Sequence, residues 1–255
     1  MSAQTDGRDA QPAIALETVE LEKSFGGVHA VDHLSVRIPR GLITGIIGPN
    51  GSGKSTLINL LSGTLPMDGG TVIIGHRRLQ TIRAHESPAN GITRTFQEIR
   101  LFPQITLMDN LLIAMTRRSV FSSLFQRGRG ARRERAEAIL WAIGLWEKRN
   151  DLAEELSYGQ RKLLEIGRVM AMDANIYLFD EPFAGLALHM IELVKSLMRR
   201  LRAEGHTIIF VSHNIGIVRE LSDYLIVMDS GELLAEGAPE PALNDPAVIE
   251  AYLGN

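Results

Sequence analysis

A glycine-rich segment at residues 48–56, GPNGSGKST, fits the pattern G-x-x-x-x-G-K-[ST] of a phosphate-binding loop. Its glycines allow the backbone N–H groups to approach an anion closely, and Lys54 can reach the outer phosphates as a point charge. The hydroxyl of Ser55 can bind Mg²⁺. These residue types at this spacing predict that the chain binds a nucleoside triphosphate. The candidate binding residues are Asn50, Gly51, Ser52, Gly53, Lys54, Ser55 and Thr56.

Two apolar segments further along the chain end in polar groups that suit hydrolysis of a bound triphosphate. Asp180 and Glu181 follow residues 176–179, and His213 follows residues 207–211 after one serine. Ligands of open α/β sheets bind beyond the carboxyl ends of the strands, so we expect these groups to meet the phosphate loop. Asp180 can hold Mg²⁺ through carboxylate oxygen. Glu181 can orient and deprotonate the attacking water, and His213 can hydrogen-bond the γ-phosphate.

Each of these groups has a simpler structural interpretation when it is taken alone. The sequence Asp-Glu-Pro after a strand is often only the turn that starts a helix, and a histidine at a strand end is more often structural than catalytic. Their occurrence together with a phosphate loop favours the catalytic interpretation. The residue types therefore predict catalytic roles for Lys54, Glu181 and His213.

The elements that position these residues follow from the spacing of apolar side chains. Residues 42–47 form an apolar run typical of a buried strand, and residues 57–61 carry leucines at helical spacing. The phosphate loop is therefore expected to cap a helix N-terminus. The nearly all-apolar runs at 176–179 and 207–211 are typical of strands in the middle of a parallel sheet that is covered on both faces.

The remaining segments complete the predicted fold. Short alternating runs over 14–38 predict an antiparallel β layer, which residues 71–75 rejoin. Helical spacing between 107 and 172 predicts a helical insertion. The chain ends with a predicted hairpin over 225–233 and a short helix over 245–253. The predicted fold class is α/β, with a mostly parallel sheet, an N-terminal antiparallel β layer and an inserted α-helical subdomain. The segments of that insertion are predicted at 107–115, 132–143 and 158–172.

Composition excludes several classes of function. The chain has 255 residues, a net charge of −3 and no cysteine, which excludes thiol catalysis and cysteine metal sites. The charge gives no general electrostatic reason to bind nucleic acid, and the basic run at 127–135 is interpreted as the solvated face of a helix. No apolar run approaches the ~18 residues of a membrane span. Residues 1–12 lack the apolar core of a secretory signal and are expected to form a flexible tail. We expect a soluble chain, which leaves docking on a membrane protein open.

The sequence Leu156-Ser157-Tyr158-Gly159-Gln160 precedes a predicted helix and has two interpretations. Ser157 as N-cap with Gln160 three residues later forms a capping box, which alone would explain the pattern. A helix N-terminus with a free hydroxyl and the small Gly159 can also accept a phosphate from a second subunit. The two interpretations are compatible.

The order of the phosphate loop, Gln97, LSYGQ, LFDEP and His213 resembles the motif set of the ATP-binding cassette (ABC) family of transporter ATPases over nearly the whole chain. The resemblance implies a P-loop NTPase core, one domain over 13–255 and a helical subdomain inserted at roughly 100–172. It implies that Gln97, otherwise an ordinary loop glutamine, contacts Mg²⁺ or the lytic water and so joins Ser55 and Asp180 at the metal. It also implies a head-to-tail dimer. In that dimer, the residues of one subunit that close over ATP on the other are Ser157, Gly159 and Gln160.

Phe25 resembles the aromatic residue of this family that stacks on adenine. A core phenylalanine beside the turn at Gly26 and Gly27 is the competing interpretation.

Finer details resemble the branched-chain amino acid uptake branch of the family. They are Tyr158 in the LSYGQ motif, the segments at 25–31, 94–97 and 100–102, and the ending at 245–254. That branch consists of importers, which implies transmembrane permease subunits, an external substrate-binding protein and a second ATPase subunit, identical or related. It implies a peripheral location at the cytoplasmic face of the inner (plasma) membrane, with no nucleic acid partner. Urea and amide importers share much of the pattern, so the solute stays open.

One departure from the family pattern concerns Ala187 and Leu188, where the family usually has Asn or Asp followed by Pro. The polar residue of the family bonds across the dimer, so its loss is expected to alter the rate or cooperativity of hydrolysis without abolishing it. The leading prediction is an ATP-hydrolysing, energy-coupling importer subunit. The alternative is a regulatory nucleotide-binding partner with weak or no hydrolysis, against which intact Glu181 and His213 argue. A cassette protein acting on ribosomes or DNA is disfavoured, because the chain shows neither two cassettes nor a coiled-coil insertion.

Overall fold

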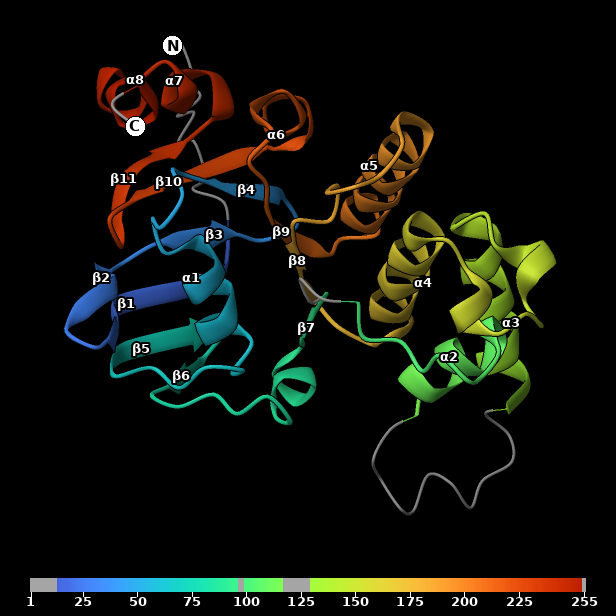
Figure 1. Ribbon diagram of the computed structural model, residues 1–255. Coiled ribbons are helices and arrows are strands. Elements are labelled where there is room, and N and C mark those ends of the chain that lie inside the picture. Colours follow the sequence, from blue (N-terminus) through green and yellow to red (C-terminus); the bar gives the residue numbers. More distant parts are fainter. Residues whose placement is uncertain (1–12, 96–98, 117–128, 254–255) are drawn as a thin grey trace, which may run out of the picture.

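The computed structural model describes residues 13–95, 99–116 and 129–253, and all statements below concern these residues (Figure 1). The tail predicted over 1–12 and the predicted site residue Gln97 lie outside them. No helix of the described segments is long and apolar enough to cross a membrane.

The larger sheet brings the predicted strands together in the order β11-β10-β4-β9-β8-β7. It is parallel from β10 to β7, and β11 pairs with β10 antiparallel, as the predicted hairpin requires. Because β9 lies between β4 and β8, the carboxyl ends of these three strands meet at one edge. The strand bounds are β4 Ile43–Ile47, β7 Ile92–Arg94, β8 Ile176–Asp180, β9 Thr207–Val211, β10 Tyr224–Asp229 and β11 Glu232–Gly237.

The smaller sheet is the predicted N-terminal antiparallel layer, with the order β2-β1-β5-β6 and β3 paired to β1. The long strand β1 pairs with β2, β3 and β5, so one segment of chain organises the layer. Figure 1 shows this sheet beside helix α1. Its strands are β1 Ile14–Phe25, β2 Val28–Leu34, β3 Arg37–Pro39, β5 Gly69–Ile74 and β6 Arg77–Leu79.

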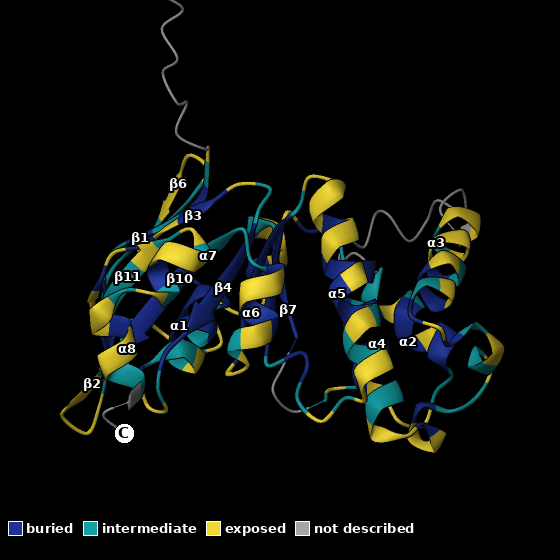
Figure 2. Ribbon diagram, turned by 90° about the horizontal axis from the view of Figure 1, so that it is seen from above, coloured by how far each residue is buried: buried dark blue, intermediate teal, exposed yellow. Residues whose placement is uncertain are grey.

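Three helices form a group apart from the two sheets. The helices α2, α3 and α4 pack against one another on the side of the molecule away from the smaller sheet (Figures 1 and 2). They occupy the predicted insertion, whose limits of roughly 100–172 stay a prediction. The bounds are α1 Lys54–Leu61, α2 Leu107–Ala114, α3 Arg129–Ala142, α4 Tyr158–Ala171, α5 Leu188–Ala203, α6 Ile215–Leu221, α7 Pro239–Leu243 and α8 Pro246–Leu253. Short 3₁₀ turns are η1 Ser87–Asn90, η4 Trp146–Lys148 and η5 Ala153–Glu155.

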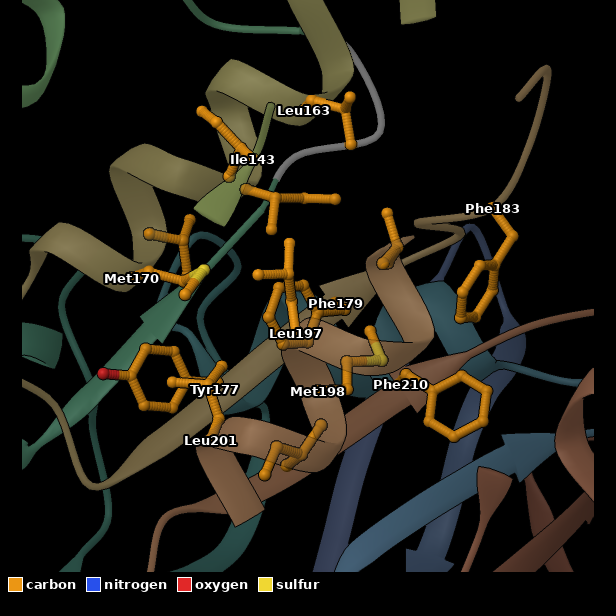
Figure 3. Packing of buried hydrophobic residues seen from close by; sticks show 14 of the residues in the cluster. Ile143, Leu163, Met170, Tyr177, Phe179, Phe183, Leu197, Met198, Leu201 and Phe210 are labelled. Carbon is orange, nitrogen blue, oxygen red and sulfur yellow. The ribbon is translucent and has the colours of Figure 1, made fainter. Parts of the chain in front are cut away.

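The larger sheet is buried on both faces, which is why its strands are almost continuously apolar. Along β8, Tyr177 and Phe179 enter one hydrophobic cluster, whereas Ile176 and Leu178 enter the other. Helix α5 covers the first face with side chains at a helical period. They are Val194, Leu197, Met198 and Leu201. Figure 3 shows Leu197, Met198 and Leu201 beside the aromatic rings of β8 and β9.

The second face packs against α1 and the smaller sheet. Ile46 of β4 shares this cluster with Leu57 and Leu61 of α1 and with Leu16 of β1. The helix that follows the phosphate loop is therefore held between two sheets. Since its apolar side is fixed there, the N-terminal end of α1 is positioned by packing rather than by helix propensity alone.

Candidate active site

The phosphate loop joins β4 to α1, as predicted, and two of its glycines leave no room for a side chain. Gly53, the N-cap of α1, has φ +95°, and a Cβ there would lie 2.2 Å from the carbonyl oxygen of Ala30. A Cβ on Gly48 would lie 2.0 Å from the carbonyl oxygen of Met228. The backbone of the loop is thus pressed between β2 and β10, where only glycine fits.

The N-terminal end of α1 provides the donors that a phosphate needs. Within the described segments, no side chain caps this helix end, and its first turn contains no acidic residue. The first amide groups of a helix lack intrahelical partners and attract anions. Ser55 is exposed at this end, so its hydroxyl is accessible to a metal bound at the phosphates.

Lys54 extends over the loop with its ammonium group next to the loop carbonyls. Its Nζ donates hydrogen bonds to the carbonyl oxygens of Gly48 at 2.9 Å and Pro49 at 2.8 Å, and to Ser52 Oγ at 3.2 Å. Burial lowers the pKa of Lys54, and the carboxylates of Glu181 and Asp180 oppose this effect. A phosphate group at the loop would favour the charged ammonium further.

Asp180 ends β8 and has one carboxylate oxygen engaged and one without a partner. Its Oδ2 lies 3.4 Å from Arg94 Nη2, whereas no hydrogen-bond donor of the described residues reaches the buried Oδ1. Burial raises the pKa of Asp180, and the cations of Arg94, Lys162 and Lys54 lower it. A buried carboxylate oxygen without a donor, close to a lysine and a phosphate loop, fits a hard cation such as Mg²⁺.

Glu181 and His213 form a direct contact beyond the ends of β8 and β9. Glu181 Oε2 lies 3.1 Å from His213 Nδ1, and the Glu181 amide donates to the carbonyl oxygen of Val211 at 3.2 Å. Glu181 has φ +48°, a left-handed conformation that is rare outside glycine and occurs often at functional sites. The side chain of His213 is 74% exposed, which leaves the rest of the imidazole accessible to a ligand.

Ser157 caps α4 in the capping box that the sequence predicts. Its Oγ accepts from the Gln160 amide at 3.3 Å, and Gln160 Oε1 accepts from the Ser157 amide at 3.1 Å. The helix α4 lies among the helices on the opposite side of the molecule from α1 in both views (Figures 1 and 2). The structure therefore brings Asp180 and the Glu181–His213 pair to the phosphate-loop edge of the sheet, but it does not bring Ser157 there.

Comparison with known proteins decides the family. Residues 31–184 match the model of the ABC transporter family, and residues 232–255 match that of the branched-chain amino acid ATP-binding cassette transporter. The chain belongs to the ABC transporter ATP-binding family.

Individual relatives cover almost the whole chain. The high-affinity branched-chain amino acid transport ATP-binding protein LivG of Salmonella typhimurium is 36% identical over 254 residues, which are 96% of this chain and 99% of LivG. The protein BraF of Pseudomonas aeruginosa, with the same description, is 36% identical over 249 residues, 94% of this chain and 97% of BraF. A nucleotide-free ATP-binding cassette from an ABC transporter has a TM-score of 0.83 at 36% identity and covers 95% of this chain and 100% of its own. A second crystallised cassette, in an ADP conformation, has the same TM-score and identity. The predicted ABC ATPase fold is confirmed.

Phe25 lies at the surface of this ABC cassette and not in its core. The residue is 49% exposed at the end of β1, and Lys23 Nζ lies 5.5 Å from the centre of its ring. The interpretation of Phe25 as a core residue is wrong, because the turn at Gly26 carries the ring out to solvent. The same hairpin contains β2, whose Ala30 contacts the phosphate loop at Gly53. Stacking of Phe25 on adenine stays a prediction.

Gly159 of the cassette has a packing role that the sequence pattern did not indicate. A Cβ at this position would lie 2.6 Å from Met190 Sδ of α5. The glycine therefore leaves space for the flexible side chain of Met190. The role of Gly159 toward ATP stays a prediction.

Arg94 is a functional candidate that the sequence pattern did not single out. The run 94–97 contributes only a detail of the family resemblance, yet Arg94 is buried beside Asp180. The signal in the sequence is an arginine at the end of the short strand Ile92–Arg94, which pairs with a strand that ends in aspartate. A buried arginine needs an anionic or polar partner, but the sequence alone could not say which.

Proposed function

We propose that this ABC cassette is the ATP-hydrolysing subunit of an importer for branched-chain amino acids or related small solutes such as amides or urea. The proposal depends mainly on the Glu181–His213 contact at 3.1 Å, which places a carboxylate at the end of the sheet that carries the phosphate loop. The transported class is inferred from the descriptions of LivG and BraF and from the match over residues 232–255.

Each group of residues at the site has its own role in ATP hydrolysis. The amides of the α1 N-terminus and Lys54 bind and orient the phosphates and stabilise the charge that develops on them. His213 Nδ1 lies 3.1 Å from Glu181 Oε2 and, when it carries a proton, would donate to this oxygen and hold the carboxylate in place. Oε1 would then accept a proton from the attacking water. Ser55, Asp180 and Gln97 would hold Mg²⁺. When bound, Mg²⁺ supplies positive charge at the outer phosphates.

The proposal includes a second ATPase subunit, identical or related, arranged head to tail. The separation of α4 from α1 within one chain supports this arrangement (Figure 1). Ser157, Gly159 and Gln160 would then close over ATP that is held by the other subunit. The transmembrane permease subunits, the external substrate-binding protein, the absence of a nucleic acid partner and the cytoplasmic face of the inner membrane belong to the same proposal.

The test is phosphate release by the purified complex with its membrane partners, comparing the native chain with Glu181→Gln. We expect the variant to lose about 10²–10⁴-fold in turnover, because a positioned general base contributes that much. Binding of a fluorescent ATP analogue should stay within about two-fold. The matched control is Glu204→Gln, which removes an exposed carboxylate that pairs with Arg200 in α5 and should leave turnover unchanged.

A regulatory subunit without hydrolysis is the second candidate function, and the N-terminus of α5 is the feature that favours it. Ala187 is the N-cap of α5, and its methyl group offers no hydrogen bond to this helix or to a partner. ATP binding without phosphate release in both the native chain and Glu181→Gln would select this candidate.

The solute class is tested separately. Uptake of labelled leucine is compared with uptake of labelled urea by reconstituted complexes, and the preferred solute distinguishes the classes.

A further inference from the structure

Arg94, the last residue of β7, is buried between the end of helix α1 and Asp180. We propose that Arg94 is a positioning residue that orients the Asp180 carboxylate toward the metal ion and couples it to the phosphate-loop helix. This inference rests on the proposed function, since it takes Asp180 as a metal ligand. Nothing in the motif set of the phosphate loop or of the strand ends assigns a role to Arg94.

The guanidinium of Arg94 is anchored on α1 independently of Asp180. Its Nη1 lies 2.7 Å from Asn59 Oδ1, 2.8 Å from Ser62 Oγ and 3.1 Å from Thr64 Oγ1. All three acceptors lie at or just after the C-terminal end of α1. The position of Arg94 is therefore set by the helix whose other end holds the phosphates.

The opposite side of the same guanidinium faces Asp180. Arg94 Nη2 lies 3.4 Å from Asp180 Oδ2, and the two side chains are 7% and 3% exposed. Because the pair is almost fully shielded from water, its attraction is screened much less than that of a surface ion pair. Oδ2 is thus drawn toward Arg94, and Oδ1 is the oxygen left without a partner among the described residues.

The residue after Arg94 holds the backbone of Asp180. Thr95 Oγ1 accepts a hydrogen bond from the Asp180 amide at 3.2 Å, and the Thr95 amide donates to the carbonyl oxygen of Leu178 at 2.9 Å. Arg94 Nε donates to the carbonyl oxygen of Thr95 at 2.9 Å, which fixes the guanidinium relative to this backbone. Side chain and main chain of Asp180 are therefore held by two consecutive residues of one segment.

The chemistry of arginine suits this position and that of lysine does not. A guanidinium presents five donors in a rigid plane, so it can contact α1 with one nitrogen and the carboxylate with another. A lysine ammonium is a single point, which cannot contact both groups with the same geometry. Groups that hydrogen-bond a metal-binding carboxylate orient it, and their loss typically costs about 10–100-fold in metal affinity.

The experiment measures binding of Mn²⁺, a paramagnetic substitute for Mg²⁺, to the full chain in the presence of ADP by electron paramagnetic resonance. The variants are Arg94→Lys, which keeps the charge, and Arg94→Gln, which removes it. We expect Mn²⁺ affinity to fall about 10–100-fold in each, while ADP affinity without metal changes less than about two-fold. The control Arg133→Lys changes an exposed arginine of α3 that pairs with Glu137, and it should behave like the native chain.

The outcomes separate this inference from the proposed function. Unchanged Mn²⁺ affinity in the folded Arg94 variants, or an equal loss of metal-free ADP affinity, would overturn the positioning role. Failure of both variants to fold would assign Arg94 to fold stability and would also overturn it. Asp180→Asn serves as the reference. If that variant binds Mn²⁺ as well as the native chain does, the metal site of the proposed function itself is wrong.

Discussion

Two glycines of the phosphate loop show how closely the surrounding chain restricts a single residue. Gly51 and Gly53 both have positive φ, +82° and +95°. Around Gly51 an added Cβ would meet no atom within 4 Å, whereas at Gly53 it would meet the backbone of β2. Gly51 is therefore required for its conformation alone, and Gly53 for both conformation and space.

The substitution Gly53→Ala is expected to lower the free energy of unfolding by about 2–4 kcal/mol. About 1–3 kcal/mol comes from the left-handed backbone, and the contact with Ala30 adds the cost of overpacking. Gly51→Ala is the matched variant and should cost only about 1–2 kcal/mol. Urea denaturation of both measures the difference. Equal losses would show that the loop moves away from β2 without cost.

At the scale of elements, the helix starts differ in a way that bears on function. The helix α4 begins with the full capping box of Ser157 and Gln160, and α2 begins with Thr106, whose Oγ1 accepts from the Asp109 amide at 3.1 Å. The helix α5 begins at Ala187, which contributes no cap. Because both α2 and α4 begin with a capping hydroxyl, removing each one in turn separates the effect of a lost cap on stability from an effect of Ser157 on ATP hydrolysis.

Ser157→Ala and Thr106→Ala each remove one N-cap hydroxyl and should each lower the free energy of unfolding by about 1 kcal/mol. Of these two hydroxyl residues, only Ser157 contacts ATP in the proposed dimer. We therefore expect a reduced ATPase rate of the assembled complex for Ser157→Ala and an unchanged rate for Thr106→Ala. Thermal melting and phosphate release measure the two effects. If both variants have the native rate, Ser157 is only a helix cap.

Ala187→Asn restores the polar residue that the family usually has and also supplies a cap to α5. The free energy of unfolding should rise by about 1 kcal/mol, since Asn is among the best N-cap residues. The ATPase rate of the complex, or its dependence on ATP concentration, should change as well. Ala238→Asn is the control, because Ala238 is the uncapped N-cap of α7. If Ala187→Asn and Ala238→Asn both keep the native ATPase rate and its dependence on ATP concentration, Ala187 has no influence on communication between the two ATP sites.

On the scale of the whole molecule, ion pairs join α5 to α6. Lys195 of α5 contacts both Glu192 and Glu220, and Arg199 Nη2 lies 2.7 Å from Glu220 Oε1. Arg202 also pairs with Asp223, at 2.8 Å, just after α6. The side chain of Lys195 is only 5% exposed, so its ammonium depends on these carboxylates.

This network predicts a pH-dependent contribution to stability. Hydrogen bonds from Lys195 and Arg199 lower the pKa of Glu220. A carboxylate with a depressed pKa stabilises the fold fully above its unfolded-state pKa of about 4.3, and this stabilisation disappears as the pH falls through the lower folded-state value. Glu220→Gln should therefore lower the urea midpoint at pH 7, and the difference from the native chain should shrink as the pH falls below about 4.3. A difference that is the same at pH 7 and at acidic pH would assign the effect to packing. The control is Glu204→Gln, because Glu204 pairs with Arg200 four residues earlier in the chain and not with another helix.

The local parts of this protein could be predicted from residue types and their spacing. The phosphate loop, the capping box of α4 and the polar ends of β8 and β9 were all predicted correctly. Each of them follows from residues that are close in the chain, because glycine conformations, helix caps and strand ends depend on local backbone geometry. The order of these motifs also identified the family, since family membership rests on residue types and spacing.

Contacts between distant segments could not be predicted from the sequence and are seen only in the folded chain. Arg94 and Asp180 are joined across 86 positions, Gly159 leaves room for Met190 of another helix, and Phe25 is exposed rather than buried. No periodicity in the sequence encodes such contacts, because they depend on the packing of whole elements against one another. The phosphate site is therefore recognisable from a short stretch of sequence, whereas the groups that support and orient that site are brought to it only by the folding of the whole chain.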